Sequence, residues 1–160
     1  MTTILGIDPG SQHTGVGLIH TSKKKITHIA HDIIHTKGGA LSERLHFIFE
    51  KICMAIETHR PARIAIEEVF IKRNVQSALK LGQARSAALI AAAKYHIPVY
   101  EYSARTIKKT IAGYGAADKS QMQYMVRLQL QLPITPPADA ADALAIAMCD
   151  SCFIQQGAQA

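Results

Sequence analysis

Four carboxylates stand at the ends of predicted secondary-structure elements. Asp8 follows the apolar run 4–7, Glu67 closes a second apolar run, and Asp139 and Asp142 open an apolar segment near the C-terminus. A carboxylate cannot be neutralised inside a sheet, so one that stands at a strand end, above a glycine-rich turn, indicates a site. Asp139 and Asp142 are three residues apart and point from one face of a first helical turn. The four residues together predict one metal site.

The chemistry of these ligands favours a hard divalent cation, Mg²⁺ or Mn²⁺, because no His or Cys set has the spacing that zinc prefers. Two such ions ~4 Å apart clamp the attacking and leaving oxygens of a phosphodiester. Lys and Arg number 18 against 12 acids, a net charge of +6. If four acids surround metal, the remaining surface is more basic still and favours a polyanion. This combination predicts a nuclease that hydrolyses with activated water and leaves 5′-phosphate and 3′-hydroxyl ends.

Each acid also has a plainer interpretation. Asp139 and Asp142 follow two prolines and carry favourable charge for a helix N-terminus. Asp8 belongs to an Asp-Pro-Gly turn. Glu67 has a neighbour, Glu68, and strand alternation places the two on opposite faces without saying which one faces the site.

Hydrophobic periodicity predicts an α/β fold in the order βββαβαβ followed by helices. The predicted strands are 3–8, 14–20, 25–34, 63–67 and 97–102, and the predicted helices are 41–56, 74–95, 103–111, 118–130 and 139–158. In a five-stranded mixed sheet the first and fourth strands can be neighbours, which would bring Asp8 near Glu67. The length predicts a single domain, 1–155, and the small-residue tail 156–160 is expected to fray.

Four motifs in this order resemble RuvC, the bacterial Holliday junction endonuclease family. They are ILGIDPGS at 4–11, AIEEVF at 65–70, SALKLGQAR at 77–85 and ADAADALAIA at 138–147. The resemblance implies an RNase H-like fold, a homodimer with two Mg²⁺ per subunit, and paired symmetric nicks at four-way DNA junctions in recombination and repair. It assigns the catalytic role to Asp8, Glu67, Asp139 and Asp142, preferring Glu67 to Glu68. It also implies a partnership with the RuvA–RuvB branch-migration complex.

Several further residues are candidates for DNA contact. Phe70 lies beside Lys72 and Arg73, where an aromatic ring can wedge between bases at an opened junction or, equally, pack in the core. The family resemblance points to Lys108 and Lys119 as phosphate contacts near the metal. Lys109 is expected to be a solvated surface charge.

Other features support plainer expectations. His31 and His35 share one parity of the third strand and His28 has the other, so the three are not expected to bind a metal together. Cys53, Cys149 and Cys152 are expected to be buried thiols. The Ala-rich helix, 79–93, suits either a dimer seam or burial within the monomer. No membrane span or signal peptide is recognisable, so a cytoplasmic protein is expected.

Two other classes of protein compete with the nuclease. Actin-like ATPases and sugar kinases begin with a similar Gly-Ile-Asp-x-Gly strand and turn, but those folds need a second lobe of comparable size. A non-catalytic junction- or RNA-binding domain would not need the acidic set. Magnesium distinguishes the nuclease from such a binding domain, because nicking requires magnesium whereas binding should survive EDTA.

Overall fold

The first three strands of the chain pair antiparallel and form one half of the sheet. They are β1 (Thr2–Asp8), β2 (His13–Thr21) and β3 (Ile26–His35). Strand β4 (Arg63–Glu67) lies parallel to β1, and β5 (Val99–Tyr102) lies parallel to β4. The sheet order is β3-β2-β1-β4-β5. The predicted mixed sheet, with the first and fourth strands adjacent, is therefore confirmed.

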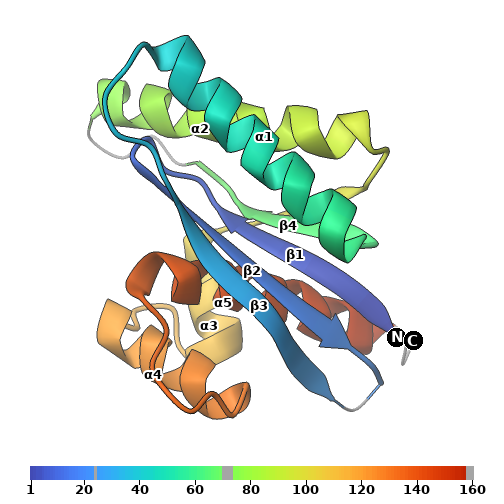
Figure 1. The fold of residues 1–160 in the computed structure, drawn as a ribbon. Helices are drawn as coiled ribbons and strands as arrows, with labels where there is room; N and C mark the ends of the chain where they lie inside the picture. Colours follow the sequence, from blue (N-terminus) through green and yellow to red (C-terminus); the bar gives the residue numbers. More distant parts are fainter. Residues whose placement is uncertain (24, 70–73, 158–160) are drawn as a thin grey trace.

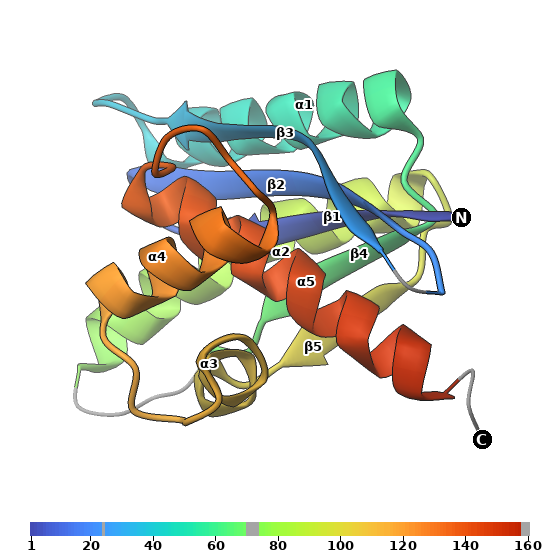
Figure 2. The same cartoon turned by 90° about the horizontal axis from the view of Figure 1, so that it is seen from below.

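Helices cover both faces of this sheet in the computed structural model, which describes residues 1–23, 25–69 and 74–157 (Figures 1 and 2). Helices α1 (Leu41–His59) and α2 (Val75–Lys94) lie on one face. The other face carries α3 (Ala104–Ala112), α4 (Lys119–Gln129) and α5 (Ala138–Gly157). Helix α5 agrees with the helix predicted over 139–158, and residues 158–160 of the tail that is expected to fray lie outside the described residues. No helix of the described part is long and apolar enough to cross a membrane.

Two hydrophobic cores result, one on each side of the sheet. The α1 and α2 side contains Ile7, Ile52 and Ile66, with the small residues of α2, such as Ala88, packed against them. Those small residues are therefore buried within the monomer. The opposite core surrounds α5, which is buried on nearly all sides over its middle. Cys53 and Cys149 are buried free thiols, and Cys152 is a partly buried one.

Polar side chains cap the helices where the sequence suggested. Ser103 accepts a hydrogen bond from the backbone of Thr106 at the start of α3. Asp118 accepts one from the backbone N–H of Gln121, and the side-chain oxygen of Gln121 accepts one from the backbone N–H of Asp118. These bonds satisfy amides that an α-helix leaves unpaired at its start. They fix where α3 and α4 begin, on the side of the sheet that carries the acids.

The prediction that His28 and His31 lie on opposite faces of β3 was wrong. The pairing of β2 with β3 shifts at Leu18 and Ile19, so that Ala30 and His28 oppose successive residues of β2. Such a bulge adds one residue to β3 and reverses the side-chain alternation beyond it. The rings of His28 and His31 consequently meet, with Nε2 and Nδ1 2.8 Å apart. His35 instead contacts His13, so the three histidines still do not converge.

Candidate active site

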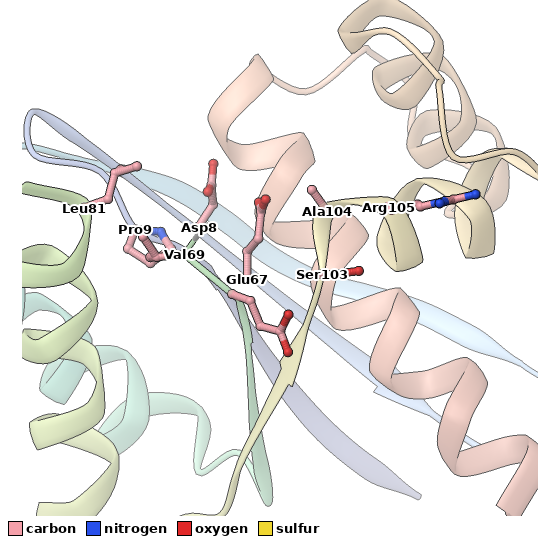
Figure 3. A pocket seen from close by; sticks show the side chains of 9 residues that line it. Asp8, Pro9, Glu67, Val69, Leu81, Ser103, Ala104 and Arg105 are labelled. Carbon is pink, nitrogen blue, oxygen red and sulfur yellow. The ribbon is translucent and has the colours of Figure 1, made fainter. Parts of the chain in front are cut away.

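Asp8 and Glu67 are the last residues of two neighbouring parallel strands. Ile7 of β1 pairs with Ile66 of β4, which places the two acids side by side at one edge of the sheet. Figure 3 shows their side chains rising from the strand ends in the same direction. Parallel strands end at the same edge, so the adjacency of β1 and β4 is what brings together residues far apart in sequence.

Strand alternation now separates Glu67 from Glu68. Ala65 belongs to the core around α5, and Glu67, two residues further along β4, shares that face. Asp8 likewise lies two residues beyond Gly6, which faces α5. Glu67 and Asp8 therefore occupy the same side of the sheet, whereas Glu68 has the opposite parity.

Glycines let α5 approach this side of the sheet closely. A Cβ added to Gly15 would overlap the carbonyl oxygen of Asp139, and one added to Gly6 would overlap that of Ala143. A Cβ on Gly17 would stand 2.7 Å from the backbone nitrogen of Leu144. The helix backbone thus rests directly on β1 and β2. This contact sets how far the first turn of α5 stands from Asp8.

Three of the four acids converge. The structure brings ligand oxygens of Asp8, Asp139 and Asp142 within 4.8 Å of one another. Glu67 is not in this group, although it lines the same pocket as Asp8 and Asp142. The donors are all carboxylate oxygens, the set that Mg²⁺ and Mn²⁺ accept and that zinc sites seldom use alone.

The electrostatics of the cluster are unfavourable in the absence of a cation. Burial, followed by the charges of Asp142, Glu67 and Asp139, raises the pKa of Asp8 from 3.8 to about 8. Burial is also the main reason why the pKa of Asp142 is raised, against the opposing charges of Lys119 and Lys108. A divalent ion would remove both costs, because it replaces the lost hydration and neutralises the repulsion. The residues therefore fit a metal.

The raised pKa of Asp8 predicts how pH acts on the metal-free protein. The folded pKa lies above the unfolded value of 3.8, so between about pH 4 and 8 the folded state binds more protons than the unfolded state. The free energy of unfolding should therefore fall as pH rises through this window. In EDTA, Asp8→Asn should gain melting temperature relative to the wild type as pH approaches 8. A difference between the two proteins that is independent of pH would contradict this assignment.

Two pockets meet at the acids. One of about 300 Å³ places Asp8, Glu67 and Asp142 opposite Lys108 and Lys119. An adjoining pocket of about 470 Å³ is lined by Asp8, Glu67, Glu68 and apolar side chains. Leu81 and Ala104 border it, while the side chain of Arg105 points away from the acids (Figure 3). A charged pocket beside a partly apolar one can receive a phosphate and its adjacent nucleoside.

The structure describes some of the predicted DNA contacts and not others. Lys108 and Lys119 line the acidic pocket, and Lys109, also on α3, is exposed. Phe70, Lys72 and Arg73 lie outside the described residues. Arg105, which no sequence motif singled out, lines the adjoining pocket from the start of α3, three residues before Lys108. The glycine contacts with α5 were not predicted either, because the sequence offered only the short spacing of Gly15 and Gly17.

The sheet order, the two helical layers and the acids at the ends of β1 and β4 and the start of α5 define an RNase H-like nuclease. The family model for "Crossover junction endodeoxyribonuclease RuvC" matches residues 4–150. The chain belongs to the RuvC family of crossover junction endodeoxyribonucleases. This confirms the resemblance carried by the four motifs.

Individual relatives agree with this membership. RuvC of Sodalis glossinidius is 49% identical over 158 residues, covering 99% of this chain and 91% of the relative. RuvC of Tolumonas auensis is 50% identical over 151 residues, covering 94% of this chain and 87% of the relative. The structure of T. thermophilus RuvC in complex with a Holliday junction substrate superposes with a TM-score of 0.92 at 33% identity. The superposition covers 98% of this chain and 97% of that one.

Proposed function

We propose that this chain resolves four-way DNA junctions by metal-dependent hydrolysis, with Asp8, Glu67, Asp139 and Asp142 as the catalytic carboxylates. The observation that carries the proposal is the convergence of Asp8, Asp139 and Asp142 within 4.8 Å, beside two lysines. Such an arrangement can neutralise a cation on one side and a phosphate on the other. A non-catalytic binding domain would have no use for half-buried carboxylates that repel one another.

The metal in this proposal is Mg²⁺, two ions per subunit, and Mn²⁺ is expected to substitute. Asp8, Asp139 and Asp142, whose oxygens converge, would hold the metal together with Glu67, which lines the same pocket. Bound there, the ions would supply an activated water and stabilise the leaving 3′-oxygen. The carboxylates would orient and neutralise the ions, and the apolar side chains of Ile107 and Met122 complete the lining of the pocket.

Lys108 and Lys119 would bind the phosphate that is to be cut. Both line the pocket with Asp142, and the charges of both lower its pKa, which indicates that they act at short range on the acids. A lysine at this position attracts phosphate and compensates the charge that develops during transfer. Junction binding by these and other cations should weaken steeply with salt.

Phe70, Lys72 and Arg73 are proposed as further DNA contacts. Their support is their place in the chain, directly after Glu68 and Val69, which line the pocket. If Phe70 stacks on a base, Phe70→Ala should lower cleavage about tenfold with little change in melting temperature, since stacking contributes ~1–3 kcal/mol. A large loss of stability with normal activity of the folded fraction would identify Phe70 as a core residue.

A second copy of this chain is the proposed partner of α2. Val75, Leu79 and Ile90 are 70%, 62% and 61% exposed. Val75 precedes Leu79 by four residues and Ile90 by fifteen, which places the three on one stripe of the helix. An apolar stripe of this kind suits a homodimer, which would present two active sites to opposed strands of the junction.

Leu79→Glu tests this dimer. A charge buried in the seam should weaken self-association at least ~100-fold, because the variant loses apolar burial and must desolvate a carboxylate. Sedimentation would then show monomers, and paired nicks would become rare single nicks. Met54→Glu, at a similarly exposed residue of α1, is the control and should remain dimeric. A monomeric wild type that still makes paired nicks would contradict the proposal.

The remaining proposals concern the cell and the domain. Junction DNA as substrate predicts a cytoplasmic enzyme, and family membership predicts that it works with the RuvA–RuvB complex. Residues 1–155 are proposed to act as one nuclease domain, since all five strands and all five helices of the described part begin within that range. Cleavage of a RuvA–RuvB-bound junction, compared with the naked junction, would test the partnership.

The proposed function is tested by cleavage of an end-labelled four-way junction beside a linear duplex of the same sequence. In Mg²⁺ the junction should receive two opposed nicks that DNA ligase seals, because the ends are 5′-phosphate and 3′-hydroxyl. The duplex should stay intact. Equal cutting of the two substrates, or ends that ligase does not seal, would overturn the proposal.

A further inference from the structure

Asp150 is a fully buried carboxylate on α5 whose two oxygens are both hydrogen-bonded. Arg63 donates from Nε to Oδ2 and from Nη2 to Oδ1, each at 2.8 Å. The hydroxyl of Tyr102 donates to Oδ1 at 2.6 Å. The guanidinium of Arg63 also stacks on the ring of Tyr100, 3.4 Å from its centre. These contacts join α5 to β4 and β5.

This ion pair lies at the far end of the elements that carry the acids. Arg63 begins β4 and Glu67 ends it, and with Ala65 they share one face of the strand, ~13 Å from end to end. On α5, Asp150 follows Asp142 by eight residues, a distance of ~12 Å along the helix. The same strand and helix are thus linked by the ion pair at one end and form the acidic site at the other.

The glycine contacts do not replace this link. Gly6, Gly15 and Gly17 bring the first half of α5 onto β1 and β2, whereas Glu67 stands on β4. If β4 and α5 pivoted relative to each other by ~5° about the ion pair, Glu67 and Asp142 would shift relative to each other by ~1 Å, because each lies ~12 Å from the pair. A shift of that size is larger than a metal site tolerates.

We propose that Arg63 and Asp150 are positioning residues that hold β4 and α5 at the crossing at which Glu67 and Asp142 share one metal site. The inference rests on the proposed role of the four carboxylates in binding metal. A buried ion pair often adds little stability compared with apolar residues of the same volume. Instead, this pair supplies directional hydrogen bonds that fix the orientation of β4 relative to α5. Apolar contact alone does not fix that orientation.

The test replaces the link by apolar residues of similar size. The triple variant Arg63→Met, Tyr102→Phe, Asp150→Leu removes both charges and leaves no orphaned hydroxyl. Its melting temperature in EDTA should stay within a few degrees of the wild type. Its affinity for Mn²⁺, measured by calorimetry without DNA, should fall about tenfold, as for other residues that orient metal ligands indirectly. Junction affinity in EDTA should not change.

Two further variants keep the test decisive. Ile56→Val, in the core on the opposite side of the sheet, lowers stability without touching α5 and should bind Mn²⁺ normally. Arg63→Lys keeps the charge but not the two-pronged geometry, and it should lower Mn²⁺ affinity even if the triple variant fails to fold. Wild-type Mn²⁺ affinity in the triple variant or in Arg63→Lys, or an equal loss in Ile56→Val, would overturn the inference. Failure of the wild type itself to bind Mn²⁺ would instead refute the proposed metal site.

Discussion

Asp8→Asn is expected to lower the rate of junction nicking about a thousandfold, since removal of a metal-binding carboxylate forfeits roughly 4 kcal/mol of transition-state stabilisation. The amide keeps the shape of the side chain and removes the charge. Asp8 stands at the centre of the cluster, where Asp142, Glu67 and Asp139 all act on its pKa, so no neighbouring acid can replace it. The measurement is a single-turnover cleavage assay in Mg²⁺.

The same variant should still bind the junction within a few-fold of the wild type, because contacts to phosphates supply most of the affinity. Asp32→Asn, the same chemical change at an exposed residue of β3, serves as the control and should cut normally. An Asp8→Asn protein that cuts at the wild-type rate would refute the assignment of the metal site.

Gly6→Ala should destabilise the fold by about 3 kcal/mol or more, the upper range for overpacking a core. The new methyl group would overlap the carbonyl oxygen of Ala143 and stand 2.8 Å from the backbone nitrogen of Ala147. Neither backbone atom can move unless α5 moves as a whole. Urea unfolding measures the loss, and Mn²⁺ affinity of the folded fraction should fall with it.

Gly157→Ala is the matched control, because nothing lies within 4 Å of the position of its Cβ. It belongs to the same helix and should change the free energy of unfolding by less than ~0.5 kcal/mol. If Gly6→Ala is as stable as Gly157→Ala, then α5 does not rest on β1 as described.

The order of elements was predictable because hydrophobic period and helix caps are local signals. Residues of β1 and β4 are apolar on both faces, as strands buried between two helical layers must be. Ser103 and Asp118 mark helix starts by the residue types that satisfy free amides. The proximity of Asp8 to Glu67 was also predictable, because the fourth strand could be placed beside the first.

The choice between Glu67 and Glu68 needed the structure or the family resemblance. Alternation along a strand gives relative faces only, and the absolute face depends on what packs against Ala65. The bulge in β3 was not predictable for a related reason. One extra residue reverses the parity of His28 relative to His31, and nothing in the local sequence marks where a strand admits it.

Close contacts between segments that are distant in the chain could likewise not be predicted from the sequence. Gly6 and Gly17 read as ordinary strand residues, and only the position of α5 explains why a side chain cannot be added there. Arg63 and Asp150 are 87 residues apart, and neither stands in a motif that suggests the other. Such pairs depend on how elements cross, which periodicity does not encode.

A metal-addition experiment on a preformed complex separates binding of the junction from its cleavage. The protein is mixed with a four-way junction in EDTA, and excess Mg²⁺ is then added while both labelled strands are followed. We expect a stable complex with intact strands in EDTA, followed by paired nicks on opposed strands after Mg²⁺ is added. Nicks that appear before the addition, or a bound junction that stays intact after it, would contradict the claim that these carboxylates cut DNA through bound metal.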